Sequence, residues 1–383
     1  MKVLVTGAKG FVGKNLVVML KRQSDVGIIG YDLDDPTSVL DEGLATADVI
    51  FHLAGVNRPE KPEDYEIGNT RFTQSLCDRL LSIGRKPTII FSSSVQATLD
   101  NHYGISKRKA EDALKHFSAE TGARIVIFRM KNIFGKWCRP NYNSAVATFC
   151  NNIARNLPIE ISDRANEVSL VYVDDICTAM KEAAGLLPSP PKCLVALPAT
   201  VYAEITPTFK VTLGYIVDTI NFFKATRSTL QVPSFNDPFI CRLYATYLSY
   251  LEESDFAYGL DIKMDTRGSL AEFLKSASFG QIFISRTKPG ITRGNHYHHT
   301  KTEKFLVVQG QALIQFRKIM PEIRGQEIDV IEYKVCGEDF RVVDIPPGYT
   351  HSIENIGEGD LVTLFWSNQI FDPNNPDTYY CEV

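Results

Sequence analysis

The chain has 383 residues, of which 44% are hydrophobic and 22% carry a charge, and its formal net charge is −4. A chain of this length is longer than one hydrophobic core typically serves, so two domains are expected. The slight acidic excess offers no basic surface for nucleic acid or an anionic membrane, and no apolar run approaches the length needed to cross a bilayer.

The chain begins with "MKVLVTGAKGFVG", which goes straight into the pattern of a buried strand. We therefore expect no signal peptide. The eight cysteines are scattered and form no C-x-x-C pair. This distribution is typical of free thiols in a reducing compartment. We therefore expect a cytoplasmic protein.

The first half of the chain alternates short β-branched runs with helical stretches such as "NTRFTQSLCDRLLSIG". Strands that are apolar on both faces and alternate with helices predict a doubly wound α/β domain with a parallel sheet. The expected strands are residues 2–6, 26–32, 48–54, 88–94 and 124–130.

After about residue 250 the apolar residues recur with a period of two, as in "KFLVVQGQALIQFRK", with Gly, Pro and Asp between the runs. This alternation predicts an antiparallel all-β barrel. The acidic stretch "LEESDFAYG" (251–259) marks the change. We expect a nucleotide-binding domain over residues 1–250 and an all-β domain over residues 255–383.

The segment "VTGAKGFVG" places Gly7, Gly10 and Gly13 between the first expected strand and the first expected helix. Glycine permits a tight turn there and lets the backbone approach a pyrophosphate at the helix N-terminus. Asp32 ends the second expected strand, where a carboxylate accepts hydrogen bonds from a ribose. A dinucleotide site is therefore predicted. Asp32 favours NAD, whereas Lys9 could pair with the 2′-phosphate of NADP, so these residues leave the choice open.

A second cluster follows in "FSSSVQATLDNHYGISKRKAED". Tyr103 and Lys107 are four residues apart at the start of an expected helix, so their side chains share one face. An ammonium beside a phenol lowers the pKa of the phenol, which makes the tyrosine a usable general acid near neutral pH. A serine at the end of the preceding strand, Ser94 in our interpretation, could hydrogen-bond a carbonyl oxygen that is being reduced.

Seven stretches in order resemble the signatures of an extended short-chain dehydrogenase/reductase: "TGAKGFVG", "HLAG", Asn69 in "GNTRF", "SSS", "YGISK", "FRMKNIFG" and "VYVDDIC". Members of that family mostly act on nucleotide sugars, and the resemblance covers about residues 1–245. It implies Ser94, Tyr103 and Lys107 as the catalytic set and places Asn132 near the substrate. It also implies a cofactor site made of Gly7, Lys9, Gly10, Phe11, Val12, Gly13, Asp32, Leu53, Ala54, Gly55, Tyr103 and Lys107.

The segment "NHYHHTKTEKF" (295–305) contains three of the seven histidines. On a strand, His296 and His298 point to one face and His299 to the other, so we expect His299 to face solvent. Glu303 follows shortly, and His351 lies in "IPPGYTHSIEN". Three imidazoles and one carboxylate form a site for a first-row transition metal that can leave positions open for substrate.

Two spacings resemble the motifs of the cupin family: G-x5-HYH-x4-E-x6-G from Gly290, and PPG-x2-H-x3-N up to Asn355. Phe340 departs from the pattern, because glycine usually opens the second motif. The resemblance implies a metal-binding cupin barrel with the ligands His296, His298, Glu303 and His351.

The whole chain resembles a family of bifunctional capsular polysaccharide enzymes that join a reductase domain to a zinc-binding cupin domain, including "KPGITRGNHYHH" and the ending "DPNNPDTYYCEV". The resemblance implies a homodimer acting on a UDP-sugar. The cupin would epimerise a UDP-2-acetamido-2,6-dideoxy-4-hexulose at carbon 3. The reductase would then reduce carbon 4 with NADPH to UDP-2-acetamido-2,6-dideoxy-L-talose, toward UDP-N-acetyl-L-fucosamine. Other first-row divalent metals in place of Zn2+, and NADH in place of NADPH, are the alternatives.

Three rival functions are compatible with parts of this pattern. The first is a 4-keto sugar reductase whose cupin is only structural, and the second is a regulator that senses NADP without catalysis. The third is an iron-dependent cupin oxygenase. Tyr103 and Lys107 disfavour the regulator, because a sensor has no need of them. The general base of the cupin step also stays open among Tyr297, His299, Lys304 and Tyr349.

Overall fold

The computed structural model describes residues 1–187, 199–319 and 329–383. Contacts within the chain divide it into two units, residues 1–220 with 241–251 and residues 221–240 with 252–383. No helix of the described residues is both long and apolar enough to span a membrane. Every cysteine in the described residues is a free thiol, and Cys193 lies outside them.

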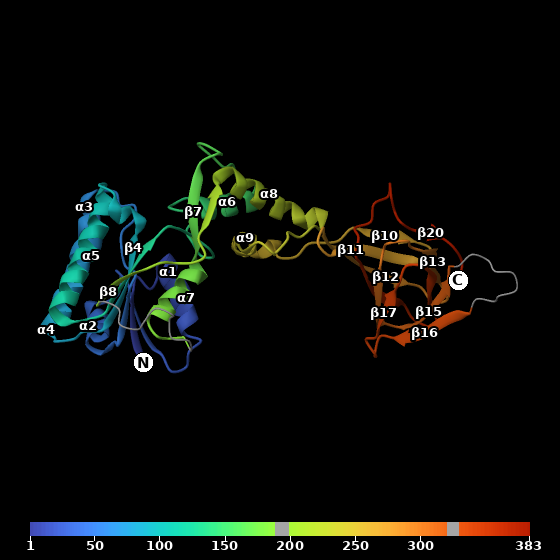
Figure 1. Cartoon of the computed structure of the whole chain (residues 1–383), viewed down its shortest axis with the longest axis horizontal. Helices are drawn as coiled ribbons and strands as arrows, with labels where there is room; N and C mark the ends of the chain where they lie inside the picture. The colour runs from blue at the N-terminus through green and yellow to red at the C-terminus, as the bar shows by residue number, and fades with distance from the viewer. Residues whose placement is uncertain (188–198, 320–328) are drawn as a thin grey trace. The chain divides into compact units, whose positions relative to one another are not determined.

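The first unit is built on a parallel sheet, as the alternation of strands and helices predicts (Figure 1). Neighbouring strands run parallel in the order β2-β1-β3-β4-β5-β8. The order reverses between β1 and β3, so a crevice for a ligand is expected at the carboxyl ends of these strands. The strand bounds are β1 Lys2–Thr6, β2 Gly27–Tyr31, β3 Val49–His52, β4 Thr88–Ser94, β5 Ile125–Met130 and β8 Thr200–Ala203.

Helices cover both faces of this sheet, which is why its strands are apolar on both sides. Val3 and Val5 of β1 belong to the core under one layer of helices, and Leu4 belongs to the core under the other. Figure 1 shows α1 and α7 on one side of the strands and α2, α4 and α5 on the other. The helix bounds are α1 Phe11–Leu20, α2 Thr37–Thr46, α4 Phe72–Ser82, α5 His102–Thr121 and α7 Val173–Ala183.

A small second sheet of the first unit, in the order β6-β7-β9, was not predicted from the sequence. Its strands are β6 Asn132–Phe134, β7 Glu167–Tyr172 and β9 Phe209–Thr212. The other helical segments are α3 Glu63–Tyr65, the π-helical η1 Glu66–Arg71, the 3-10 segments η2 Val95–Thr98 and η3 Glu253–Asp255, α6 Ala145–Ala154, α8 Leu213–Thr229 and α9 Pro238–Leu248.

The second unit holds two mostly antiparallel sheets, in the orders β10-β11-β12-β19-β14-β17 and β16-β15-β18-β13-β20. Alternate residues of facing strands form its core, for example Phe305 and Val307 of β14 and Ile314 and Phe316 of β15. The predicted fold class, a doubly wound α/β domain followed by an all-β cupin barrel, is confirmed. The strands are β10 Ile262–Asp265, β11 Gly268–Ser276, β12 Gly280–Thr287, β13 Thr292–Tyr297, β14 Glu303–Gln309, β15 Gln311–Lys318, β16 Val330–Cys336, β17 Val342–Ile345, β18 Tyr349–Asn355, β19 Leu361–Ser367 and β20 Tyr379–Tyr380.

One close backbone approach sets the position of α5. The Asn101 side chain caps this helix by accepting a hydrogen bond from the Gly104 N–H at 2.8 Å. A Cβ on Gly104 would lie 2.1 Å from the carbonyl oxygen of Gln96 in η2. The first turn of α5, which carries Tyr103, therefore packs against η2 more closely than a residue with a side chain permits.

We predict that Gly104→Ala destabilises the first unit. In an open helix this change would stabilise by about 1 kcal/mol. Here the added methyl group meets backbone oxygens at 2.1 and 2.6 Å, and overpacking should outweigh that gain by about 2 kcal/mol. Urea unfolding of the full chain, followed by circular dichroism, measures the difference.

Gly27→Ala is the matched control, because a Cβ at this β2 position meets no atom closer than 3.6 Å. We expect the Gly27→Ala protein to unfold at the wild-type urea concentration. A Gly104→Ala protein as stable as this control would show that α5 does not depend on the close approach.

Candidate functional site

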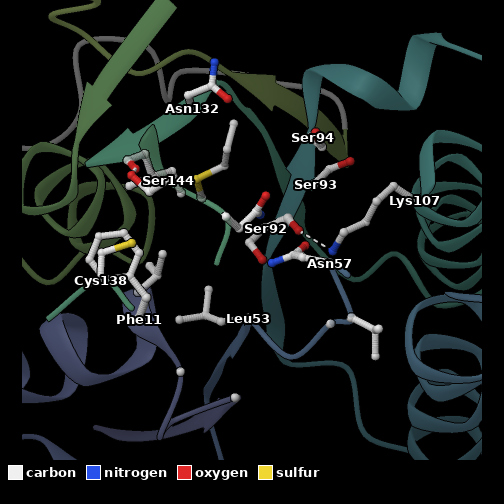
Figure 2. A pocket seen from close by; sticks show the side chains of 18 of the residues that line it. Phe11, Leu53, Asn57, Ser92, Ser93, Ser94, Lys107, Asn132, Cys138 and Ser144 are labelled. Carbon is white, nitrogen blue, oxygen red and sulfur yellow. Dashed lines mark hydrogen bonds between the residues drawn. The ribbon is translucent and has the colours of Figure 1, made fainter. Parts of the chain in front are cut away.

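A cavity of about 540 Å³ lies at the carboxyl ends of β1, β3 and β4 in the first unit. Figure 2 shows Lys107 reaching toward Ser92 on one side of it, with Asn132, Cys138 and Ser144 on the other. Three of the predicted cofactor-binding residues, Lys9, Asp32 and Ala54, do not line this cavity. The predicted residues that line the cavity are Gly7, Gly10, Phe11, Val12, Gly13, Leu53, Gly55, Ser94, Tyr103, Lys107 and Asn132.

Two glycines of the loop, Gly7 and Gly13, stand where there is no room for a side chain. Gly7 has a φ of +71°, and a Cβ there would lie 2.7 Å from the backbone nitrogen of Ala54. A Cβ on Gly13 would lie 2.0 Å from the Gly7 carbonyl oxygen. The loop therefore presents bare backbone between the end of β1 and the start of α1, which fits the pyrophosphate of a dinucleotide.

Burial changes the acidity of both members of the Tyr–Lys pair. It raises the pKa of Tyr103 to about 12, although a hydrogen bond to Ser94 opposes the shift. The lowering of this pKa that the sequence predicted is therefore wrong, because burial outweighs the effect of the neighbouring lysine. Burial lowers the pKa of Lys107 to about 8, against the opposing charge of Glu111. The Lys107 ammonium donates to the Ser92 carbonyl oxygen at 2.9 Å. Lys107 can therefore change its charge near neutral pH.

The three serines that end β4 have different partners. The Ser93 hydroxyl donates to Glu111 at 2.5 Å, so it is directed into a buried network. The Ser94 hydroxyl accepts from the Gln96 N–H at 3.1 Å and hydrogen-bonds Tyr103. Ser94 is thus the serine that shares a hydrogen bond with Tyr103, which supports its predicted role.

Glu111 anchors α5, the helix that carries Tyr103 and Lys107, and was not identified from the sequence. Its carboxylate is fully buried and accepts hydrogen bonds from Ser93 on β4, Arg129 on β5 and Tyr202 on β8. These bonds join α5 to three strands of the sheet, one turn beyond Lys107. Buried charge of this kind is costly unless its hydrogen bonds are satisfied, which the three partners achieve.

Two asparagines from the family signatures lie in different places. Asn132 lines the cavity from β6, and its side-chain amide donates to the Ser169 carbonyl oxygen at 3.3 Å. Asn69 is buried and holds the loop after β3 by bonding the backbone of Val56 at 2.9 and 3.0 Å. Asn69 also donates to Ser106 at 3.0 Å, which ties this loop to α5.

The segment "KWCRPNYNS" supplies cavity residues that the sequence analysis missed. Trp137 and Asn141 have positive φ values of 68° and 53°, so the chain turns tightly here. The Arg139 guanidinium lies 5.1 Å from the ring centre of Tyr142. The sequence did offer a signal for these residues, because a cation and two amides, Arg139, Asn141 and Asn143, follow closely after Asn132. The wall residues found only in the structure include Asn57, Gln96, Cys138, Arg139, Tyr142, Asn143 and Ser144.

Lys9 and Asp32, between which the sequence left the cofactor choice open, lie beside each other. The Asp32 carboxylate accepts a hydrogen bond from the backbone N–H of Lys9 at 2.8 Å. The Lys9 ammonium instead contacts Asp34 at 2.7 Å and Asp35 at 2.8 Å. Asp34 and Asp35 were not singled out in the sequence.

The four predicted metal ligands converge in the second unit. His296 of β13 pairs with His351 of β18, and His298 follows β13 directly. Glu303 begins β14 and so comes from the other sheet. One potential ligand atom from each of the four residues lies within 4.8 Å of all the others.

These side chains fit a divalent metal ion. The Nε2 atoms of His298 and His351 are buried without a hydrogen-bond partner, and they lie 3.4 and 3.7 Å from a Glu303 carboxylate oxygen. Burial lowers the pKa of His351 to about 2 and also lowers that of His296, so both imidazoles are neutral. Neutral imidazoles whose nitrogen lone pairs are not used in hydrogen bonds, together with one carboxylate, are the ligands that such an ion requires.

The C-terminal segment orients one of these ligands. The Asp377 carbonyl oxygen accepts from His298 Nδ1 at 2.6 Å, which directs Nε2 of the ring toward the other ligands. The Asp377 carboxylate accepts the backbone N–H groups of His299, Thr300 and Lys301 at 3.0, 2.9 and 2.8 Å. Asp377 therefore fixes the turn that follows His298.

The alternation of strand residues separates the four candidates for the cupin base. Tyr297 ends β13 between the ligands His296 and His298, so its ring points away from them, and His299 is exposed as expected. Lys304 is exposed next to Glu303 and pairs with Asp344. Tyr349 precedes His351 by two residues on β18 and shares its side of the strand.

Two family models match the chain. The model of the NAD dependent epimerase/dehydratase family matches residues 3–188, and that of the polysaccharide biosynthesis C-terminal domain matches residues 263–379. The two matches fall in the first and second units respectively.

Two relatives match the chain along its full length, and a more distant one matches part of it. The UDP-2-acetamido-2,6-beta-L-arabino-hexul-4-ose reductase of Pseudomonas aeruginosa is 42% identical, over 100% of this chain and 99% of that protein. The crystal structure of the capsular polysaccharide assembling protein CapF from Staphylococcus aureus has 46% identity and a TM-score of 0.90, with 100% of both chains covered. A UDP-glucuronic acid 4-epimerase from Bacillus cereus, at 17% identity and a TM-score of 0.54 over 65% of this chain and 99% of that one, shares the fold alone.

We predict that Asp377→Ala weakens metal binding, because the turn after His298 loses four hydrogen bonds to the carboxylate, three from backbone N–H groups and one from the Thr300 hydroxyl. Loss of a group that orients a ligand should lower the affinity about tenfold or more. Titration of the metal-free protein with Zn2+ against a chromogenic chelator measures the effect.

Asp372→Ala is the control, since this exposed carboxylate lies in the same segment and, within the described residues, accepts a hydrogen bond only from the Asn374 N–H. It should bind Zn2+ like the wild type. An Asp377→Ala protein with unchanged affinity would show that the C-terminal segment does not position His298.

Proposed function

The chain belongs to the family of the capsular polysaccharide protein CapF, and we propose that it is a bifunctional nucleotide-sugar enzyme. The cupin domain, residues 255–383, epimerises a UDP-2-acetamido-2,6-dideoxy-4-hexulose at carbon 3. The reductase domain, residues 1–250, then reduces the 4-keto group to UDP-2-acetamido-2,6-dideoxy-L-talose, a precursor of UDP-N-acetyl-L-fucosamine. The observation that carries this proposal is a full set of reductase residues and a full set of metal-binding residues in one chain.

In the reductase site a bound nicotinamide cofactor supplies the hydride that adds to carbon 4. Tyr103 gives its phenolic proton to the oxygen of the ketone, and Ser94 orients that oxygen by a hydrogen bond. The Lys107 ammonium favours the phenolate that Tyr103 becomes. These roles are supported by the common cavity and by the hydrogen bond between Ser94 and Tyr103.

In the cupin site a divalent metal held by His296, His298, Glu303 and His351 supplies a Lewis acid for the 4-keto group. Tyr349, as the phenolate, removes the proton from carbon 3, since it is the candidate on the ligand side of its strand, and a proton from solvent adds to the opposite face of that carbon. Zn2+ suits three imidazoles and one carboxylate. The family resemblance implies a homodimer and NADPH, with NADH as the alternative cofactor.

The chemistry of a 4-keto sugar gives the order of the steps. The ketone at carbon 4 acidifies the proton on carbon 3, which permits inversion there. Reduction of the ketone removes that acidity. Epimerisation must therefore precede reduction, and the reduction makes the new configuration permanent.

A second candidate function is a 4-keto sugar reductase whose cupin only binds a structural metal. The name of the Pseudomonas relative favours it, because that name mentions the reduction alone. The two functions differ in what happens when a metal ligand is removed.

We predict that Tyr103→Phe and His296→Ala each fail to form the talose product, and that an equimolar mixture of the two forms it. Tyr103→Phe lacks the proton donor for reduction, and His296→Ala lacks a metal ligand needed for epimerisation. NMR of the products with the 4-keto sugar and reduced cofactor measures this. If the wild type and His296→Ala formed the same reduced sugar at the same rate, with carbon 3 not inverted, this would favour the second candidate.

We predict that the rate of reduction falls as the pH rises through about 8. The Lys107 pKa is lowered to about 8, so the ammonium is present below this pH and is lost above it. Removal of the charge should lower kcat/KM about 100-fold or more. Cofactor oxidation, followed by absorbance from pH 6 to 10, gives the profile.

Lys107→Met should be slow at every pH in this range and should lack the decline near pH 8. Lys109→Met is the control, because Lys109 is exposed on the same helix and pairs with Glu66 at 3.1 Å. A decline that persists in Lys107→Met would assign the titration to another group.

A further inference from the structure

Four charged side chains gather where β2 ends beside the glycine loop, and we infer from them that this chain selects NADH over NADPH. The inference rests on the proposed function, because it concerns the cofactor of the reductase. The two cofactors differ by one phosphate on the ribose 2′-oxygen, which lies beside the end of the second strand in a doubly wound domain. In this chain Asp32, Asp34, Asp35 and Lys9 meet there.

Asp32 is held in the position of a ribose acceptor. It follows β2 directly, and its Oδ2 atom accepts from the backbone N–H of Lys9 in the glycine loop at 2.8 Å. Its own backbone N–H donates to Asp35 at 2.8 Å. The carboxylate is thus fixed beside the loop that fits the pyrophosphate. It can accept hydrogen bonds from ribose hydroxyls, but it would repel a 2′-phosphate.

Lys9 is the cation that would have to attract the phosphate. Residues 7–13 and 31–37 contain no other lysine or arginine. The Lys9 ammonium is already bound by Asp34 at 2.7 Å and Asp35 at 2.8 Å, and these hydrogen bonds hold its pKa above the ordinary value. A phosphate would have to displace one of these carboxylates.

The sum of the four charges points the same way. Three carboxylates against one ammonium leave a formal charge of −2 where the phosphate would bind. The 2′-hydroxyl of NADH brings no charge to this position. The discrimination is therefore electrostatic, and it should weaken in salt.

The test is the dissociation constant of each reduced cofactor for the full chain, without sugar, from the fluorescence of the nicotinamide. We expect NADH to bind at least about 10-fold more tightly than NADPH at low ionic strength. The ratio should shrink toward 1 M salt, where the screening length falls to about 3 Å. NADPH bound as tightly as NADH, or more tightly, would overturn the inference.

Two variants test the named residues. Asp34→Asn removes one partner of Lys9, so NADPH should bind about 3-fold or more tightly than to the wild type while NADH binding stays unchanged. Asp32→Asn keeps an oxygen for the Lys9 N–H but loses the charge, so the ratio between the cofactors should fall about 5-fold or more. Unchanged ratios in both variants would refute the assignment to these carboxylates.

Asp41→Asn is the control for net charge. Asp41 is exposed on α2 and pairs with Arg79 at 2.7 Å, away from the loop. It should leave the ratio at the wild-type value, and an equal effect of Asp34→Asn and Asp41→Asn would show that only the total charge matters.

Failure of this inference differs from failure of the proposed function. A wild-type chain that binds neither cofactor would refute the reductase function, and the inference with it. A chain that binds NADPH more tightly and oxidises it with the 4-keto sugar would refute the inference alone.

Discussion

Both candidate sites depend on basic nitrogen atoms that the fold keeps out of water. Lys107 is 3% exposed, and His298 and His351 are 2% and 1% exposed. Burial disfavours the charged forms of Lys107 and His351, so it lowers the pKa of the amine to about 8 and keeps the His351 imidazole neutral. A buried polar atom without a partner costs free energy, so the surrounding structure must hold it in place. Hydrogen bonds to Glu111 and Asp377 contribute to this in the two units.

Local sequence patterns were sufficient to predict the fold class and most of the candidate site residues. Val3 and Val5 pack into one core and Leu4 into the other. A strand buried on both faces must be apolar at every position, which makes it recognisable in the sequence. The metal ligands could be predicted because three of them fall within eight residues of one strand and its successor. Such short patterns are recognisable because the geometry of a strand fixes which neighbouring residues share a face.

Contacts between distant residues could not be predicted in this way. Glu111 bonds Tyr202 across 91 residues, and His298 bonds Asp377 across 79. The roles of Ser93 and Ser94 separate only when the partners of each hydroxyl are known. The position of Lys9 between two aspartates likewise results from the path of the chain after β2. Tertiary packing determines each of these contacts.

The central claim is that the cupin acts on the sugar before the reductase does, and proton exchange tests it most directly. We would incubate the UDP-linked 4-keto sugar with the protein in deuterated water, without nicotinamide cofactor, and follow carbon 3 by NMR. The account predicts that deuterium enters at carbon 3 with the wild type and not with His296→Ala. No exchange by a wild-type protein that still reduces the sugar when cofactor is added would contradict the account.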